Sequence, residues 1–350
     1  MEPIKTMSAA ETSERIYDLL VIGGGVNGTG IARDACGRGA SVLLVEQDDL
    51  ASYTSSSSTK LIHGGLRYLE YYEFRLVREA LMERERLLTM APHIMWPLRF
   101  VLPHSKLVRP AWMLKAGLFL YDHLASNMTL PKSIGVDFRK HSSGRALKPE
   151  YTKGFIYSDG WVQDSRLVVL NAMDAAERGA DVRVRTRLTA AQRVNGQWVA
   201  TLEDRITGQT QTVRAKAMVN AAGPWVARLL ADTLKIPNSK SVRLVKGSHI
   251  IVPRVYEGPQ AYIFQNPDKR IVFAIPYEQK FTLIGTTDIP WKDEPGKVGI
   301  APDEVTYLCE SVNRYLNVQV RESDVVWSYA GLRPLYDDAS ANASAVTRDY

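Results

Sequence analysis

Residues 18–28 read DLLVIGGGVNG, a short apolar run that leads directly into a cluster of glycines. The run Asp18–Ile22 has the nearly continuous apolar character of a buried parallel strand. The glycines keep the spacing Gly23-x-Gly25-x-x-Gly28, which is the fingerprint of a turn that binds the pyrophosphate of a dinucleotide. The stretch therefore predicts a strand, a tight turn and the start of a helix in a Rossmann-like unit.

Each glycine of the fingerprint has its own role. Gly23 permits the tight turn, Gly25 leaves room for the pyrophosphate, and Gly28 lets the helix pack closely on the strand. The helix predicted over residues 26–38 would direct its first N–H groups at the phosphates. The spacing alone is a weak signal, and the alternative is a glycine turn that binds no nucleotide.

A second apolar strand is predicted over residues 41–45, and Glu46 stands at its end, 18 residues after Gly28. A carboxylate at this place accepts hydrogen bonds from ribose hydroxyls. The unit does not separate NAD from FAD, because both carry the same adenosine diphosphate group.

Residues further along the chain favour FAD. Residues 182–218 predict three short strands with Asn-Gly and Thr-Gly turns, a meander typical of flavoproteins. The apolar strand 218–222 then ends at Ala222 and Gly223, where backbone can approach a flavin nucleotide. The alternative for this last piece is an ordinary strand end.

Composition sets the broad class of the protein. The 350 residues are 45% hydrophobic and 23% charged, which is typical of a globular chain of about two domains. The net charge of +6 favours anionic partners without choosing among them. The two cysteines have no metal-ligand spacing, and no dense basic run or zinc-finger pattern is present, so neither a metal site nor nucleic-acid binding is expected.

The start of the chain and its hydropathy give two further expectations. Residues 1–17 are polar, contain acidic side chains and lack the apolar segment of a secretory signal, so they are expected to form a flexible tail. No run of about 18 apolar residues occurs, and no transmembrane helix is predicted.

Residues 55–69 read SSSSTKLIHGGLRYL, a serine run followed by a dense polar cluster and a helix predicted over 73–90. Together with other blocks, this stretch makes residues 18–350 resemble the FAD-dependent glycerol-3-phosphate dehydrogenases of the aerobic, respiratory type. These enzymes belong to the D-amino-acid-oxidase-like superfamily of flavoproteins. The more specific blocks are HGGLRYLE at 63–70 and KGSHI at 246–250, and GLRPL at 331–335 also matches.

The resemblance implies an α/β fold, α+β overall, in which a Rossmann-like FAD-binding domain carries an inserted substrate domain with an antiparallel sheet. The FAD-binding domain is expected to consist of residues 18–90, 153–231 and 328–350. The substrate domain, or cap, is expected to consist of residues 91–152 and 232–327. Family members continue past Tyr350 with a helical C-terminal domain, which is absent from this sequence.

The resemblance also implies the chemistry, which is the oxidation of sn-glycerol 3-phosphate to dihydroxyacetone phosphate. Hydride would pass from C2 to flavin N5, and the electrons would pass on to a membrane quinone. Such a site needs guanidinium groups for the phosphate, hydrogen-bond donors for the hydroxyls and a group that accepts a proton. The predicted substrate-binding residues are Arg67, Tyr68, Thr286, Arg333 and Arg348, and the predicted catalytic residues are His249 and Arg333.

In this family the loop after the second strand lies along the flavin. The residues predicted to bind the cofactor there are Ser55, Ser57, Ser58 and His63, with Thr54 as a further candidate. Several of these assignments have an ordinary structural alternative. His249 can be a core histidine, an arginine can be a solvated surface charge, and His63 can orient the loop instead of touching the flavin. The identity of the catalytic base stays open.

Partners and location follow from the same resemblance. Residues 98–124 combine basic and aromatic side chains, which suits an anionic membrane surface, although a surface loop with a buried helix explains the pattern equally well. The expected location is the cytoplasmic face of the inner membrane, as a peripheral protein, or the cytoplasm. A homodimer is a further expectation.

Three other functions are kept beside the dehydrogenase. The first is a glycerol-3-phosphate oxidase, in which oxygen accepts the electrons. The second is an oxidase of the D-amino-acid or sarcosine type. The third is a nucleotide-binding fragment without turnover, because the sequence stops at Tyr350.

Overall fold

The computed structural model describes residues 15–105, 110–236 and 242–336. These residues form two compact units, each assembled from segments that lie far apart in the sequence. The first unit contains residues 15–56, 164–236, 242–243 and 333–336, and the second contains residues 57–105, 110–163 and 244–332.

A six-stranded sheet in the order β7-β2-β1-β10-β9-β8 organises the first unit. Four neighbouring strands of this sheet are parallel. β1 pairs in parallel with both β2 and β10, and β2 pairs in parallel with β7. The strands β8, β9 and β10 are antiparallel neighbours, which confirms the predicted meander. The strands are β1 (Ile16–Ile22), β2 (Val42–Val45), β7 (Asp181–Arg183), β8 (Thr186–Val194), β9 (Gln197–Asp204) and β10 (Thr210–Asn220).

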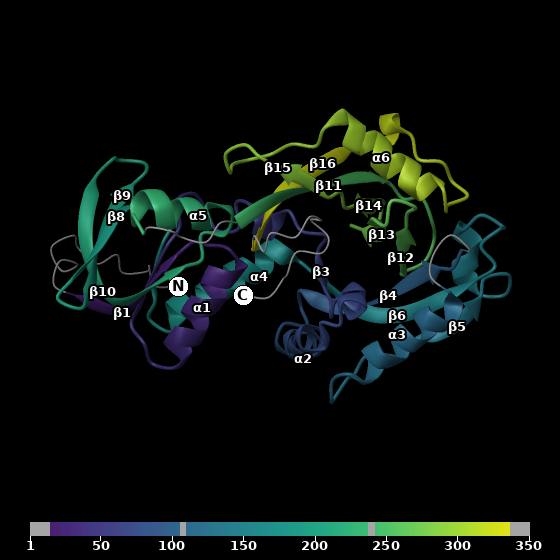
Figure 1. Ribbon diagram of the computed structural model, residues 1–350, viewed down its shortest axis with the longest axis horizontal. Helices are drawn as coiled ribbons and strands as arrows, with labels where there is room; N and C mark the ends of the chain where they lie inside the picture. Colours follow the sequence, from purple (N-terminus) through teal and green to yellow (C-terminus); the bar gives the residue numbers. More distant parts are fainter. Residues whose placement is uncertain (1–14, 106–109, 237–241, 337–350) are drawn as a thin grey trace. The chain divides into compact units, whose positions relative to one another are not determined.

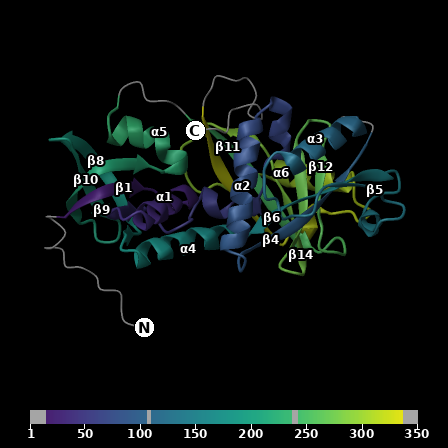
Figure 2. The ribbon, with the colours of Figure 1, turned by 90° about the horizontal axis from the view of Figure 1, so that it is seen from below.

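Helices cover one face of this sheet. α1 (Val26–Gly37) and α4 (Asp164–Glu177) lie next to each other (Figures 1 and 2). Val21 on β1 faces this side and shares a core cluster with Ala32 of α1 and Ala175 of α4. The alternate side chains of β1 face the other side, where they pack with the meander and with Leu229, which follows the short helix α5 (Val226–Arg228).

The second unit is built on a ten-stranded sheet, whose main path is β15-β11-β14-β13-β12-β4-β6-β3. β16 pairs with β11, and β5 pairs with β6. The pairs that join β11 to β14, β13 and β12 are antiparallel, as predicted, while β12 and β4 pair in parallel. The strands are β3 (Leu61–Ile62), β4 (Met95–Pro103), β5 (Ile134–Asp137), β6 (Lys153–Val162), β11 (Val242–Pro253), β12 (Ala261–Gln265), β13 (Ile271–Tyr277), β14 (Phe281–Gly285), β15 (Ile289–Trp291) and β16 (Trp327–Tyr336).

Both faces of this second sheet are covered. α6 (Pro302–Asn313) packs on one face, and α2 (Phe74–Met90) and α3 (Ala111–His123) pack on the other (Figure 1). Successive residues of β11 alternate between these two cores, with Ile250 on the α6 side and Ile251 on the side of α2 and α3. None of the helices in the described residues is both long and apolar enough to cross a membrane.

The observed units differ from the predicted domains at their boundaries. Residues 57–90 and 153–163 were predicted to belong with the glycine turn, but their contacts place them in the second unit. The reason is that β3 and β4 both pair with β6, which ties these segments to the larger sheet. The predicted tail also ends earlier than expected, because Ile16 and the buried Tyr17 belong to β1.

Candidate functional site

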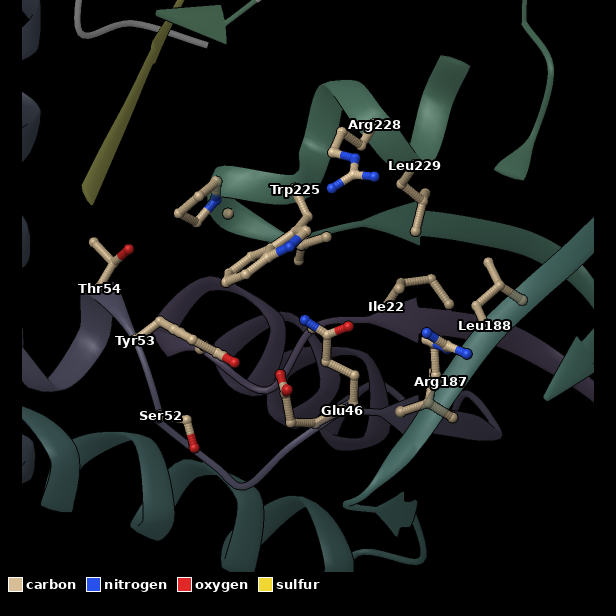
Figure 3. A pocket seen from close by; sticks show the side chains of 18 of the residues that line it. Ile22, Glu46, Ser52, Tyr53, Thr54, Arg187, Leu188, Trp225, Arg228 and Leu229 are labelled. Atoms are coloured by element: carbon tan, nitrogen blue, oxygen red, sulfur yellow. The ribbon is translucent and has the colours of Figure 1, made fainter. Parts of the chain in front are cut away.

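A pocket of about 320 Å³ opens at the carboxyl ends of β1, β2 and β10 in the first unit (Figure 3). This is the edge of a parallel sheet at which ligands bind in doubly wound folds. The pocket is lined by the glycine turn, the end of β2, the segment after it, the start of β8 and the segment after β10. Of the predicted cofactor residues, it brings together Gly23, Gly25, Glu46, Ser55, Ala222 and Gly223.

The glycine turn has the close contacts that the fingerprint predicts. A Cβ on Gly28 would lie 1.9 Å from the carbonyl oxygen of Gly23, so only glycine lets α1 sit this close to the turn. Gly23 itself has φ +116°, a backbone conformation that residues other than glycine rarely adopt. Gly25 precedes the first residue of α1, and the helix therefore begins at the edge of the pocket.

Glu46 holds this turn in place while lining the pocket. Its Oε2 accepts a hydrogen bond from the N–H of Gly24 at 2.6 Å, and its Oε1 accepts one from the N–H of Asp48 at 2.8 Å. Burial raises the pKa of the Glu46 carboxyl above its ordinary value, and the bonds from Asp48 and Gly24 partly offset that shift. Each carboxylate oxygen has a second lone pair, so the group can still accept a hydrogen bond from a ribose hydroxyl.

The serine run is divided between the two units. Ser55 lines the pocket, and its hydroxyl accepts a hydrogen bond from the N–H of Val26 at the start of α1, over 2.9 Å. Ser57 and Ser58 belong to the second unit, where the Ser58 hydroxyl accepts from the N–H of Lys60 and its carbonyl accepts from the hydroxyl of Tyr329. Of the predicted run, Ser55 and the further candidate Thr54 therefore border this pocket.

Sequence reasoning missed an aromatic pair in the pocket. Tyr53 and Trp225 meet edge to face with ring centroids 4.5 Å apart, and Figure 3 shows both rings together with the guanidinium groups of Arg187 and Arg228. Trp225 stands two residues after Gly223, inside the motif NAAGPWV, and that position was the available signal. Tyr53 carried no comparable signal, because its role depends on packing against a residue far along the chain.

His249 lies on β11 of the second unit and is only 2% exposed. Its Nε2 atom is 2.9 Å from the hydroxyl of Thr59, and its ring stacks on Tyr329 with centroids 4.7 Å apart. A Cβ on Gly285 would fall 2.1 Å from its ring, so the neighbouring strand has to carry glycine there. Neither Thr59 nor Tyr329 was predicted, because they lie 190 and 80 positions from His249 in the sequence.

A buried ion pair supports β11 close to His249. Glu304, on the first turn of α6, is 3% exposed and lies 2.7 Å from Lys246 Nζ. The hydroxyls of Ser248 and Thr287 donate to its Oε1 at 2.8 and 2.7 Å. Burial would raise the pKa of Glu304, but Lys246 and the other hydrogen bonds hold this pKa below its ordinary value.

The remaining predicted residues of the second unit occupy one loop and one strand end. Arg67 and Tyr68 are half-buried on the 3₁₀ turn Leu66–Tyr71, and His63 is exposed just before it. Thr286 follows β14, and its hydroxyl donates to the carbonyl oxygen of Thr287. Arg333 lies on β16 and is assigned to the first unit. Arg348 lies outside the described residues.

The chain belongs to the family of FAD-dependent oxidoreductases, because the family model with that description matches residues 18–346. FAD is the cofactor of this family, which confirms the cofactor predicted from the sequence. The chain is 57% identical to the glycerol-3-phosphate dehydrogenase of Pseudomonas aeruginosa, over 98% of this chain and 67% of that protein. It is 54% identical to the aerobic glycerol-3-phosphate dehydrogenase of Escherichia coli, over 95% of this chain and 66% of that protein.

Two further relatives extend the comparison. The D-erythritol 1-phosphate dehydrogenase of Brucella abortus is 55% identical over 95% of this chain and 66% of that protein. The glycerol-3-phosphate dehydrogenase of Bacillus halodurans, solved in complex with FAD, superposes with a TM-score of 0.74 at 32% identity, over 95% of this chain and 59% of that one. The chain thus spans about two thirds of the length of the curated relatives it matches.

Proposed function

We propose that the protein oxidises sn-glycerol 3-phosphate to dihydroxyacetone phosphate, as an FAD-dependent dehydrogenase. The identity of 54 to 57% with two proteins named glycerol-3-phosphate dehydrogenase carries this proposal. The pocket supports it, because the glycine turn, Glu46 and the start of α1 form a fitting site for the adenosine and pyrophosphate groups of FAD.

In this proposal FAD supplies the acceptor for the hydride that leaves C2 of the substrate, at flavin N5. The chain itself has to bind the phosphate, orient the C2 hydroxyl and take up its proton. We assign the phosphate to the guanidinium groups of Arg67, Arg333 and Arg348, because paired N–H groups match phosphate oxygens. Tyr68 and Thr286 would donate hydrogen bonds to substrate oxygens, and His249 would receive the hydroxyl proton.

A second substrate is D-erythritol 1-phosphate, favoured by the 55% identity to the Brucella abortus dehydrogenase. Both substrates are phosphate esters of small polyols, so the same arginines would serve either one. The difference between them is the length of the carbon chain, which the residues beside the reacting carbon have to accommodate.

Flavin reduction without oxygen tests both substrates. The FAD-loaded protein would be mixed with glycerol 3-phosphate, D-erythritol 1-phosphate, glycerol or D-alanine, and loss of the oxidised flavin absorbance would be followed. We expect reduction by one or both polyol phosphates and none by glycerol, which lacks the phosphate. Reduction by D-alanine alone would rule out this function in favour of an amino-acid oxidase.

We further propose that a membrane quinone accepts the electrons and that the protein associates peripherally with the inner membrane. α3 supports the second point, because Trp112 and Phe119 on it are 70% and 63% exposed, whereas Leu118 is buried. Flotation with anionic liposomes tests the membrane association, and the double variant Trp112→Ser, Phe119→Ser should no longer float with the liposomes.

Quinone reduction compared with peroxide yield separates the dehydrogenase from an oxidase. Light scattering tests the expected homodimer.

A further inference from the structure

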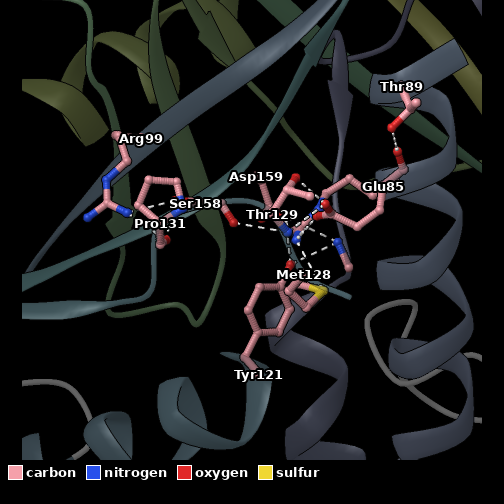
Figure 4. Close-up of polar contacts among 11 residues, drawn as sticks. Glu85, Thr89, Arg99, Tyr121, Met128, Thr129, Pro131, Ser158 and Asp159 are labelled. Atoms are coloured by element: carbon pink, nitrogen blue, oxygen red, sulfur yellow. Dashed lines mark hydrogen bonds and ion pairs between the residues drawn. The ribbon is translucent and has the colours of Figure 1, made fainter. Parts of the chain in front are cut away.

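A network of buried charges joins three elements of the second unit. Arg84 on α2, Tyr121 on α3 and Asp159 on β6 are 1%, 1% and 3% exposed. The Tyr121 hydroxyl donates to Oδ1 of Asp159 over 2.7 Å (Figure 4), and Arg84 Nη1 donates to the same oxygen over 2.7 Å. Burial and the nearby Asp159 raise the pKa of Tyr121 well above its ordinary value, so its hydroxyl keeps the proton that it donates.

A second carboxylate completes the surroundings of Arg84. Glu85 Oε1 accepts from Arg84 Nη2 at 2.9 Å, and Glu85 Oε2 accepts from the N–H of Thr129 at 2.9 Å. The carbonyl oxygen of Ser158 also accepts from Arg84 Nη1. The buried guanidinium is therefore matched by carboxylates on two sides, as a charge in an apolar interior requires.

The network ends on one backbone group, the N–H of Gly64. This N–H donates to the Tyr121 hydroxyl at 2.8 Å and lies 3.3 Å from Oδ1 of Asp159. β3 pairs with β6 over two residues, and its last partner on β6 is Gly160. Asp159 is the next residue of β6, so its side chain continues the contact where the backbone ladder of β3 stops.

Gly64 leaves no room for a side chain at this contact. A Cβ there would lie 2.4 Å from Leu81 and 2.7 Å from the hydroxyl of Tyr121. Gly65 then turns the chain with φ 76° into the 3₁₀ turn Leu66–Tyr71, which carries Arg67 and Tyr68. The orientation of that turn therefore depends on how firmly the Gly64 backbone is held.

We propose that Tyr121 and Asp159 are positioning residues, which hold the Gly64 N–H and so fix the turn Leu66–Tyr71 that presents Arg67 and Tyr68 to the substrate. Arg84 holds the Asp159 side chain in the orientation that this task requires. The proposal rests on the proposed function for what the turn binds, but the anchoring of Gly64 rests on the contacts alone. Groups held in place before the substrate arrives have less freedom to lose on binding.

A purely structural network would stabilise the unit without affecting the turn. Tyr121→Phe separates the two cases, because it removes the hydroxyl that reaches Gly64 and leaves the Arg84–Asp159 ion pair intact. Tyr157→Phe is the matched control. Tyr157 is a buried tyrosine that shares a core cluster with Tyr121 and lies on the same strand as Asp159. The N–H of Gly64 donates to the hydroxyl of Tyr121 and not to that of Tyr157.

Two measurements on the FAD-loaded protein test the proposal. In Tyr121→Phe, we expect hydrogen–deuterium exchange of the peptide 61–69 to accelerate about tenfold, the effect of losing one hydrogen bond. The half-saturating concentration of glycerol 3-phosphate should rise by a similar factor, while the limiting rate of flavin reduction changes much less. Tyr157→Phe should leave both quantities close to those of the wild type, because it keeps the Tyr121 hydroxyl and its bond to Gly64.

The outcomes separate the anchor from the proposed function. Unchanged exchange at 61–69 in a folded Tyr121→Phe protein would overturn the anchor, and faster exchange with unchanged substrate affinity would overturn the positioning role. A wild-type protein that no polyol phosphate reduces would contradict the proposed function, and the exchange result would still decide the anchor. If Tyr121→Phe does not fold, Asp159→Asn, which keeps the size of the side chain, is measured in the same way.

Discussion

The N–H of Gly24 donates to the Oε2 atom of Glu46 over 2.6 Å, and this bond fastens the glycine turn to the end of β2. Because β1 and β2 are parallel neighbours, their carboxyl ends meet at one edge, and a single side chain can reach from one to the other. Glu46 therefore has two tasks, to shape the turn and to line the pocket.

Replacing Glu46 tests whether its side chain supports cofactor binding. Glu46→Gln keeps the size of the side chain but puts an amide N–H₂ against one of the two backbone N–H donors. We expect the dissociation constant for FAD to rise about tenfold, the loss of roughly one hydrogen bond. Titration of the apoprotein with FAD measures it. Glu177→Gln at the end of α4 is the control, because this exposed side chain does not line the pocket. An equal loss of affinity in both variants would contradict a role for Glu46.

Gly28→Ala should prevent the cofactor site from forming. The added Cβ would lie 1.9 Å from the carbonyl oxygen of Gly23, which belongs to backbone that cannot easily move. We expect purified protein with little bound flavin and a lower thermal midpoint. Gly30→Ala, two residues along α1, has open space around its Cβ and should retain flavin. Normal flavin content in Gly28→Ala would contradict the close contact between Gly28 and the carbonyl oxygen of Gly23.

The Tyr53–Trp225 pair should contribute to cofactor affinity. Trp225→Leu removes an edge-to-face contact worth about 0.5–1.5 kcal/mol together with one wall of the pocket, so FAD should bind about tenfold more weakly. Trp198→Leu changes a tryptophan of the same unit that does not line the pocket, and its affinity should stay close to that of the wild type. Equal affinities in the two variants would place FAD away from this wall.

Glu304 should make the stability of the second unit depend on acid. Its pKa is lowered in the folded chain, so its contribution is fully present above the unfolded pKa and is lost as the pH falls through the folded pKa. The loss should begin near the ordinary value of 4.5 and continue below it.

The variant Glu304→Gln isolates this contribution. At pH 7 it leaves Lys246 buried beside a neutral group, which should lower the free energy of unfolding by about 3–5 kcal/mol. The difference in the free energy of unfolding between this variant and the wild type should become smaller as the wild-type carboxylate is protonated. Urea unfolding at pH 7 and at pH 4 measures it, and a constant difference at both values would contradict the assignment.

The Arg84–Asp159 pair should show strong coupling. Arg84→Met or Asp159→Leu alone leaves a buried charge without its main partner and should cost about 3–5 kcal/mol. The double variant removes both charges and should lose much less than the sum of the two single losses. A double-mutant cycle in urea measures the coupling, and additive losses would mean that the two side chains do not form a pair in solution.

The first unit could be predicted well because its signals are local. The glycine spacing, the apolar strands on either side and Glu46 lie within 29 residues, and the structure brings them to one pocket. Local signals could not predict the places of Ser57 and Ser58, which do not line the pocket. They belong to the second unit, because β3, a few residues further on, pairs with β6 of the larger sheet.

Contacts between distant residues could not be predicted in the same way. Thr59, His249 and Tyr329 come from three separate segments of the chain, and they meet only in the folded unit. Asp159 carries no signal of its own in the sequence, and its side chain reaches the N–H of Gly64 only because β6 pairs with β3. Such groups acquire their roles from sheet order, which the amino-acid pattern of a single segment does not contain.

The parallel pairing of β1 with β10 also affects the time at which the first unit can fold during synthesis. Ile16 pairs with Arg214, so 198 positions separate two neighbouring strands of one sheet. At a synthesis rate of about 5–20 residues per second, β1 has to wait roughly 10–40 s for this partner. During that interval its apolar side chains, Leu20 and Ile22 among them, lack part of their final cover and would be a natural binding site for a chaperone on the growing chain.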